Sequence, residues 1–287
     1  MYERKKRSGS LLCYPFETKR LDKWTPPYIT QPKLDGDRSR AVRVANIGTP
    51  DDWVLFSSTE EVIVSVPHIN AMLSNMNIPD NITELDGELY VHGWTWEQIN
   101  SVVSRTVNIH PEYEKMEFHV FDVVEEITPQ ARRIALLNTI AFNDLVIRVP
   151  HRIAFTLNDV MTNYQEYLDL GYEGIIVRHF EAPYLRRRSI YAMKFKPKKQ
   201  DWYVITGWKE EVDKFKNPKG RLGAFVCEGN DGTSFDVGSG LNTEQRVEYW
   251  GIRDDLIGRI VVVGYQNIIT GSNKPRFPIF IEIKEPF

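Results

Sequence analysis

The spacing of apolar residues in the first two thirds of the chain predicts a mixture of helices and strands. Val160, Tyr164 and Leu168 lie on one helical face and Gly171 follows them, which is typical of a helix with a buried stripe and a glycine stop. By similar criteria, and by a capping-box sequence that begins at Thr95, helices are predicted over residues 95–104, 129–138 and 156–170. Short apolar runs predict strands over residues 54–56, 88–91 and 175–177.

The pattern changes near Pro197. Beyond it, short β-like runs alternate with glycines, and one short helix is predicted over residues 242–250. The predicted strands cover residues 203–206, 223–227, 234–237, 259–263 and 280–283. Closely spaced short strands favour a β-sandwich or a small β-barrel. We therefore place a domain boundary in the polar stretch Lys198-Lys199-Gln200, which gives domains of residues 1–199 and 200–287.

Length and composition are those of a globular protein with about two domains: 287 residues, of which 42% are hydrophobic and 26% charged. No apolar run approaches the roughly 18 residues of a membrane-spanning helix, so we expect no membrane partner. Because the formal net charge is −3, any binding of nucleic acid must come from a local basic face.

The N-terminus and the cysteines indicate a cytoplasmic protein. The basic residues Arg4 to Arg7 are followed by Ser8-Gly9-Ser10 and not by an apolar stretch, which argues against a secretory signal. They form either a solvated tail or a flexible arm that touches phosphates. The two cysteines, Cys13 and Cys227, lie far apart and are too few for a four-thiolate zinc site, so we expect both to be reduced.

A lysine stands beside a tight Asp-Gly turn in the segment Gln31-Pro32-Lys33-Leu34-Asp35-Gly36-Asp37-Arg38. A lysine amine is a nucleophile only when it is neutral, so a pKa of roughly 10.4 must be lowered by neighbouring cations or by burial. Lys33 is therefore a candidate site for covalent attachment of a phosphate, with an ordinary exposed turn as the alternative.

Acidic residues form two further candidate sites. Glu84, Asp86 and Glu88 surround a predicted turn and can bind ribose hydroxyls or a hard cation such as magnesium. Glu173 stands at the mouth of the strand predicted over residues 175–177, where a carboxylate is well placed to bind a metal. The alternatives are a solvated acidic turn for the first site and a plain helix-to-strand turn for the second.

Two lysines follow a basic stretch that begins at Arg186. If residues 191–196 form a strand, Lys194 and Lys196 project from the same face, away from Phe195. Two cations on one face can hold a triphosphate and lower the pKa of a reactive lysine. A solvated basic edge strand is the alternative.

In this order, the four segments resemble the motifs of the covalent nucleotidyltransferase superfamily of ATP-dependent ligases and mRNA capping enzymes. Lys33 to Arg38 matches its Lys-x-Asp-Gly-x-Arg adenylation motif at every fixed position. Residues 85–89, 118–122, 173–178 and 194–196 resemble the remaining nucleotide-pocket motifs. Ser57-Ser58 stands where many relatives carry a Ser-Arg pair.

The likeness continues into the second domain, where residues 219–224, 237–241, 256–258 and 276–278 look like the OB-fold domain of small DNA ligases. The resemblance implies an α+β fold, with an ATP-grasp-like nucleotidyltransferase domain followed by an OB-fold β-barrel. It implies an ATP-dependent DNA ligase of the minimal bacteriophage or viral type, acting as a monomer on nicked duplex DNA with ATP as co-substrate and Mg²⁺. The implied contacts to the DNA backbone are Lys209, Lys214, Lys216, Lys219 and Arg221.

The resemblance also implies roles for single residues. Lys33 attacks the α-phosphate of ATP, while Lys194 and Lys196 stabilise the charge that develops there. Glu173 binds the metal, with Asp86 as a second candidate. The implied nucleotide contacts are Gln31 to the adenine amine, Phe121 or else Phe118 to the face of the base, and Arg38 and Glu88 to the ribose.

Three other functions are compatible with parts of this pattern. An RNA ligase shares the lysine and acidic motifs, but the OB-like tail argues against it. A capping guanylyltransferase is disfavoured because no Arg-x-Asp-Lys sequence stands near the C-terminus. A non-catalytic OB-fold protein that binds nucleic acid would have no need for the intact set of Lys33, Glu88, Glu173, Lys194 and Lys196.

Overall fold

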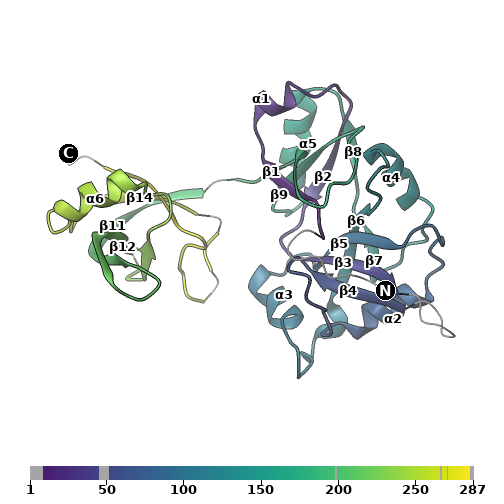
Figure 1. Ribbon diagram of the computed structural model, residues 1–287, viewed down its shortest axis with the longest axis horizontal. Coiled ribbons are helices and arrows are strands. Elements are labelled where there is room, and N and C mark those ends of the chain that lie inside the picture. The colour runs from purple at the N-terminus through teal and green to yellow at the C-terminus, as the bar shows by residue number, and fades with distance from the viewer. Residues whose placement is uncertain are drawn as a thin grey trace. The chain divides into compact units, whose positions relative to one another are not determined.

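The computed structural model describes residues 9–44, 52–197, 199–229, 231–265, 267–269 and 271–284. The basic segment from Arg4 to Arg7 lies outside these residues, as does Lys198. The chain divides into two compact units, Met1–Lys196 and Pro197–Phe287 (Figure 1), so the division falls three residues before the predicted end of the first domain at 199. None of the helices in the described ranges is long and apolar enough to cross a membrane.

Two five-stranded sheets form the first unit. Its strands are β1 Leu12–Pro15, β2 Tyr28–Lys33, β3 Asp37–Val44, β4 Asp52–Ser57, β5 Glu84–Tyr90, β6 Glu117–Val123, β7 Val146–Arg148, β8 Arg152–Ala154, β9 Gly174–His179 and β10 Arg188–Phe195. One sheet, here called the Lys33 sheet, has the order β1-β10-β9-β2-β8. The other, here called the Glu88 sheet, has the order β4-β3-β5-β6-β7.

Helices cover both sheets (Figure 1). They are α1 Thr18–Leu21, α2 Pro67–Asn75, α3 Trp96–Val103, α4 Gln130–Leu137 and α5 Leu157–Asp169, with a 3₁₀ helix Tyr113–Lys115. On the Lys33 sheet, α5 packs against β2, β8 and β9. On the Glu88 sheet, α2 packs against β4 and β7, α3 against β3 and β5, and α4 against β6. Apolar side chains between each sheet and its helices form two buried clusters.

The three helices predicted in this unit are confirmed as α3, α4 and α5. The Thr95 hydroxyl accepts from the backbone N–H of Gln98 at 3.3 Å, and the Gln98 side chain accepts from the backbone N–H of Thr95 at 2.8 Å, which completes the capping box. Beyond α5, Gly171 has a φ of +85°, a conformation that glycine adopts without strain. Helix α2 was not predicted.

The acidic segment 84–88 is a strand, so the predicted turn is wrong. Strand β5 lies between β3 and β6 in the centre of the Glu88 sheet, with Glu84 and Asp86 buried. Buried carboxylates are tolerated when cations pair with them, and arginines from β3 and from the segment before β10 do so here. The prediction failed because these arginines are distant in sequence from residues 84–88. Without such partners, three acidic residues within five positions indicate a turn.

The second unit is one five-stranded antiparallel sheet with a helix. Its elements are β11 Lys199–Val212, β12 Pro218–Glu228, β13 Ser234–Val237, α6 Thr243–Gly251, β14 Ile260–Tyr265 and β15 Ile279–Ile283, and the sheet order is β13-β12-β11-β14-β15. A parallel bridge between Ser239 and Ile279, with a 2.8 Å hydrogen bond from the Phe280 N–H to the Ser239 carbonyl, joins the two edges. The predicted strands and the predicted helix of this unit are confirmed.

Candidate active site

A cavity of about 190 Å³ lies between the two sheets of the first unit. Strands of both sheets contribute to its wall, which is the place where the sequence segments singled out above meet. Its lining residues are Leu12, Cys13, Gln31, Pro32, Lys33, Leu34, Arg38, Ser58, Glu88, Phe121, Ile176, Arg178 and Lys194.

Lys33 ends β2 and points its amine at Glu173, the residue directly before the neighbouring strand β9. Its Nζ is ion-paired with Glu173, whose other carboxylate oxygen accepts from Lys196 Nζ at 2.5 Å. The backbone N–H of Glu173 also donates to the Lys33 carbonyl at 3.0 Å. Glu173 therefore joins the candidate nucleophile to one of the two predicted cations.

Two glycines make this approach of strands possible. A Cβ on Gly174 would collide with the carbonyl oxygen of Phe195, and one on Gly36 would collide with the carbonyl oxygen of Leu89. At both glycines the neighbouring backbone is too close for a Cβ. Glycine is therefore required directly after Glu173 and three residues after Lys33.

The charge state of Lys33 differs from the expectation that neighbouring cations lower its pKa. Burial lowers the pKa of Lys33, but the charges of Glu173, Glu88 and Asp35 and the hydrogen bond to Glu173 together raise it above its ordinary value. Conversely, burial raises the pKa of Glu173, yet Lys33 and Lys196 hold it below its usual range. In this structure the pair is an ammonium facing a carboxylate.

Two further titratable groups face Lys33. Burial raises the pKa of Glu88 to about 7, although Lys33, Arg38 and the Gly36 N–H at 3.2 Å oppose that rise. Burial, followed by the charge of Lys33, lowers the pKa of Lys194. Strand β10 ends at Phe195, so Lys194 lies in the strand and Lys196 just beyond it, and both reach the neighbourhood of Lys33.

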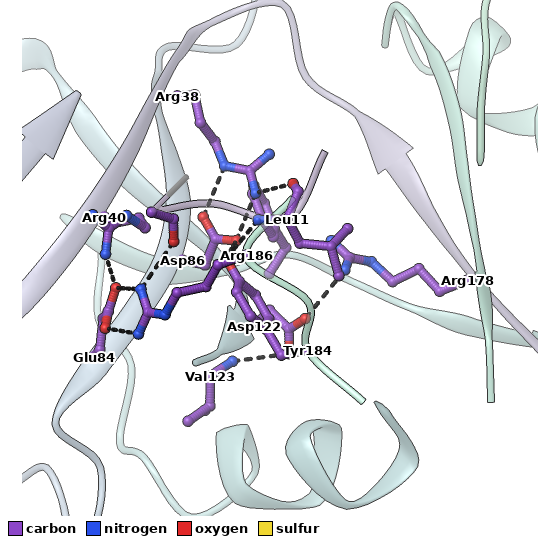
Figure 2. Close-up of polar contacts among 12 residues, drawn as sticks. Leu11, Arg38, Arg40, Glu84, Asp86, Asp122, Val123, Arg178, Tyr184 and Arg186 are labelled. Atoms are coloured by element: carbon purple, nitrogen blue, oxygen red, sulfur yellow. Dashed lines mark hydrogen bonds and ion pairs between the residues drawn. The ribbon is translucent and has the colours of Figure 1, made fainter. Parts of the chain in front are cut away.

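A closed ring of hydrogen bonds fixes the position of the Arg38 side chain (Figure 2). Its Nε and Nη2 donate to the two oxygens of Asp86 at 2.7 and 2.5 Å, and Nη2 also donates to the Leu11 carbonyl at 3.1 Å. The Tyr184 hydroxyl donates to Asp86 at 2.6 Å and accepts from the Leu11 N–H at 3.0 Å. Asp86 is fully buried and faces Arg38, so the structure does not bring it to the cavity as the metal ligand that the sequence suggested.

Phe121 lines the cavity, whereas Phe118 is fully buried in the core of the Glu88 sheet. The two residues are three positions apart on β6, so strand alternation puts their side chains on opposite faces of the sheet, and a β-bulge follows Val120. Asp86 of β5 pairs with Asp122, while its neighbour Gly87 pairs with Val120, so Phe121 is an extra residue on β6. The bulge shifts the alternation beyond it, so Asp122, which pairs with Asp86, also lies on the face of the sheet away from Phe118.

The side chain of Gln31 lies between the two sheets and contacts both. Its Nε2 donates to the Phe121 carbonyl at 3.0 Å, and its Oε1 accepts from Arg178 Nε at 2.9 Å. Arg178 in turn donates from Nη1 to Asp122 at 3.1 Å (Figure 2). Gln31 thus belongs to a buried polar network.

Several residues of the site had no role assigned from sequence. Tyr184 and Leu11 carried no motif signal, because their importance arises only when β1 and the segment before β10 approach β5. Arg178 and Asp122 stood inside recognised motif segments, but their partners are distant in sequence. Ser58, where many relatives carry an arginine, does line the cavity.

Comparison with known families agrees with the two units. The model of the ATP dependent DNA ligase domain matches residues 11–196, which is more than half of the 287 residues. The model of the DNA ligase OB-like domain matches residues 216–284.

Named relatives of this chain are DNA ligases. The DNA ligase of Haemophilus influenzae is 26% identical over 202 residues, which cover 68% of this chain and 70% of the relative. The DNA ligase of African swine fever virus, from a tick isolate of Malawi, is 26% identical over 214 residues, which cover 69% of this chain and 49% of the relative. The chain therefore spans about half the length of this viral relative.

Solved structures of DNA ligases share the fold. A Lig E DNA ligase, solved in a study of DNA binding with a minimal scaffold, superposes with a TM-score of 0.76 at 23% identity, covering 96% of this chain and 99% of that one. Chlorella virus DNA ligase-adenylate superposes with a TM-score of 0.53 at 22% identity, covering 98% and 99%. These likenesses show a nucleotidyltransferase domain followed by an OB-like domain. Together with the family model that covers most of the first unit, they confirm the expected family: the chain belongs to the ATP-dependent DNA ligases.

Proposed function

We propose that this protein seals nicks with 3′-hydroxyl and 5′-phosphate ends in duplex DNA, and that it carries AMP on Lys33 between two of the steps. The observation that supports this proposal is the position of Lys33: its amine lies in a cavity with Lys194 and is bridged by Glu173 to Lys196.

In the first step, Lys33 Nζ attacks the α-phosphate of ATP, an N–P bond forms, and pyrophosphate leaves. The ammonium must lose a proton before it attacks, and Glu173, hydrogen-bonded to Nζ, is the acceptor within reach. Lys194 and Lys196 stabilise the negative charge that develops on the phosphate, which is the main help a protein gives to phosphoryl transfer. AMP then passes to the 5′-phosphate, and the 3′-hydroxyl attacks, seals the strand and releases AMP.

Residues around Lys33 fit a magnesium ion. Glu173 and Glu88 both act on the charge of Lys33 and on one another, so two carboxylates share one small region. Magnesium usually keeps several waters and takes its other ligands from phosphates, so one or two carboxylates suffice to hold it. Held by Glu173, with Glu88 nearby, Mg²⁺ would neutralise charge on the phosphates.

The rest of the cavity suits a nucleotide. Gln31 and Phe121 are the proposed contacts of the adenine base, as the resemblance implied. Arg38 and Glu88 are the proposed contacts of the ribose, and Arg38 is held in place by Asp86 and Tyr184. Action as a monomer, which the resemblance implied, is part of this proposal. Two free thiols, Cys13 and Cys227, support a reducing cytoplasmic location, in a host cell if the source is viral.

The hairpin of β11 and β12 supplies the proposed contacts to the DNA backbone. Three of the five basic residues expected there are paired within the unit, since Lys209 binds Asp236 at 2.5 Å and Glu211 binds both Lys219 and Arg221 at 2.7 Å. Lys214 and Lys216, which are exposed between the two strands, are therefore the stronger candidates. Contacts of this kind bind phosphates without reading sequence.

Self-adenylation tests the proposal most directly. Incubation with labelled ATP and magnesium is expected to add one AMP to the intact protein, and peptide analysis is expected to locate it on Lys33. Nicked DNA and nicked RNA duplexes, compared side by side, then identify the substrate. Faster sealing of RNA would favour an RNA ligase, labelling by GTP in preference to ATP would favour a guanylyltransferase, and the lack of any adduct would favour a non-catalytic binder.

We expect Glu173→Gln to slow self-adenylation about 100-fold or more while leaving the folded structure intact. The amide keeps the shape of the side chain but can neither accept the Lys33 proton as a base nor supply a charge to a metal. Rates of AMP attachment, measured with thermal unfolding of the same samples, check this. Glu166→Gln is the matched control, because Glu166 pairs with Arg152 on the surface. Wild-type adenylation by Glu173→Gln would assign the metal and the proton to another residue.

A further inference from the structure

The amide of Gln31 offers a donor at one end and an acceptor at the other, and a half-turn of the side chain exchanges them. Which end faces a bound base decides which base is accepted. Adenine carries an amine at the position where guanine carries an oxygen, so an acceptor matches adenine and a donor matches guanine. The following inference rests on the proposed function, in which Gln31 contacts the base.

The structure fixes the orientation of this amide from both ends. Arg178 Nε can only donate, and it lies 2.9 Å from Gln31 Oε1. The Phe121 carbonyl can only accept, and it lies 3.0 Å from Gln31 Nε2. Reversing the amide would set two donors against each other at one end and two acceptors at the other. Gln31 and Arg178 are almost fully buried, so water does not replace these partners.

Arg178 is itself held in place. Its Nη1 donates to Asp122 Oδ2 at 3.1 Å (Figure 2), and the same carboxylate accepts from Arg133 Nε at 2.9 Å and from the Val123 N–H at 3.0 Å. Asp122 is fully buried, so its charge and the two guanidinium groups fix one another. The orientation of Gln31 is thus set by a network that reaches behind the pocket.

We propose that Arg178 is a positioning residue that makes the pocket select adenine over guanine nucleotides by fixing the amide of Gln31. Arg178 uses one lone pair of the Gln31 oxygen and leaves the second for the amine of adenine. The oxygen of guanine would meet that lone pair without a hydrogen between them, which is costly in a buried site. Without Arg178, the amide turns more readily and presents its NH₂ group to guanine.

The test compares the rates at which Lys33 acquires AMP from ATP and GMP from GTP. Arg178→Met is expected to lower the ratio of the two rates about tenfold or more, because one of two constraints on the amide is lost. Asp122 keeps Arg133 in this variant, so its buried charge stays paired. Arg152→Met, which removes an arginine from the surface of the same unit, serves as the control and is expected to leave the ratio unchanged. An unchanged ratio in Arg178→Met would overturn the proposal.

Gln31→Glu provides the second variant. Beside Arg178 a carboxylate stays charged and accepts at both oxygens, so it presents no donor to guanine. We expect Gln31→Glu to prefer ATP at least as strongly as the wild type. A loss of that preference in Gln31→Glu would refute the role of the amide. If the wild type acquires no nucleotide on Lys33, the proposed function fails; if it does and Arg178→Met stays selective, only this inference fails.

Discussion

Lys33→Ala is expected to abolish the sealing of ordinary nicks with ATP, yet to keep measurable sealing of a nick that already carries AMP on its 5′-phosphate. Lys33 is the nucleophile only in the first step. In the last step the nucleophile is the DNA 3′-hydroxyl and AMP is the leaving group. Positioning and electrostatics from Glu173, Glu88 and Lys196 remain, and these sustain much of phosphoryl transfer without a covalent intermediate.

Single-turnover sealing of nicked and pre-adenylated duplexes measures the two abilities separately. Lys196→Ala is the contrasting variant and is expected to slow both self-adenylation and the sealing of the pre-adenylated nick, because its ammonium acts on the phosphate in each. Near wild-type sealing of ordinary nicks by Lys33→Ala would rule out lysyl-AMP at this position. If Lys33→Ala folds and binds DNA but does not seal the adenylated nick, the division of roles is wrong.

Asp122→Asn is expected to destabilise the first unit by about 3–5 kcal/mol, the usual cost of removing one partner from a buried ion pair. Asp122 is fully buried and its two oxygens accept from Arg133 and Arg178. The substitution keeps the size of the side chain and removes its charge. Both guanidinium groups are then left in the interior without a counter-ion, and the new NH₂ group cannot accept from them.

Urea unfolding of the full chain, followed by tryptophan fluorescence, measures the loss. Asp236→Asn is the matched control: Asp236 pairs with Lys209 at 2.5 Å, but its side chain is 47% exposed, and surface pairs contribute about 1 kcal/mol or less. Equal losses of unfolding free energy in the two variants would contradict the assignment of Asp122 as a buried counter-ion of two arginines.

Local signals were sufficient for the helices that were predicted. Thr95 and Thr156 both form complete capping boxes, and the apolar stripe of α5 packs on the Lys33 sheet as its period required. Strand β5 shows where prediction from the local sequence fails. Glu84, Asp86 and Glu88 have the composition of a turn, and only arginines far along the chain make their burial in a central strand tolerable.

The candidate site likewise contains residues that could be predicted from the sequence and residues that could not. Lys33, Glu173, Lys194 and Lys196 were found because the chemistry of a reactive lysine requires such residues at motif spacing, and the structure brings them together. Their individual roles stay predictions. The residues that orient them could not be foreseen, because Tyr184 meets Asp86 across 98 residues and Arg178 meets Gln31 across 147. The raised pKa of Lys33 likewise depends on which acids lie beside it, and spacing alone does not show that.

The positions of the two thiols have a practical consequence. Cys227 is fully buried in the core of the second unit, and burial raises its pKa to about 12, so it resists alkylation. Cys13 is half-buried on β1 and lines the cavity that contains Lys33. A maleimide fluorophore would therefore label the native protein at one place, beside the nucleotide pocket. Because Cys13 lines that pocket, bound ATP would protect it from labelling, and the loss of labelling would report nucleotide binding without any engineered residue.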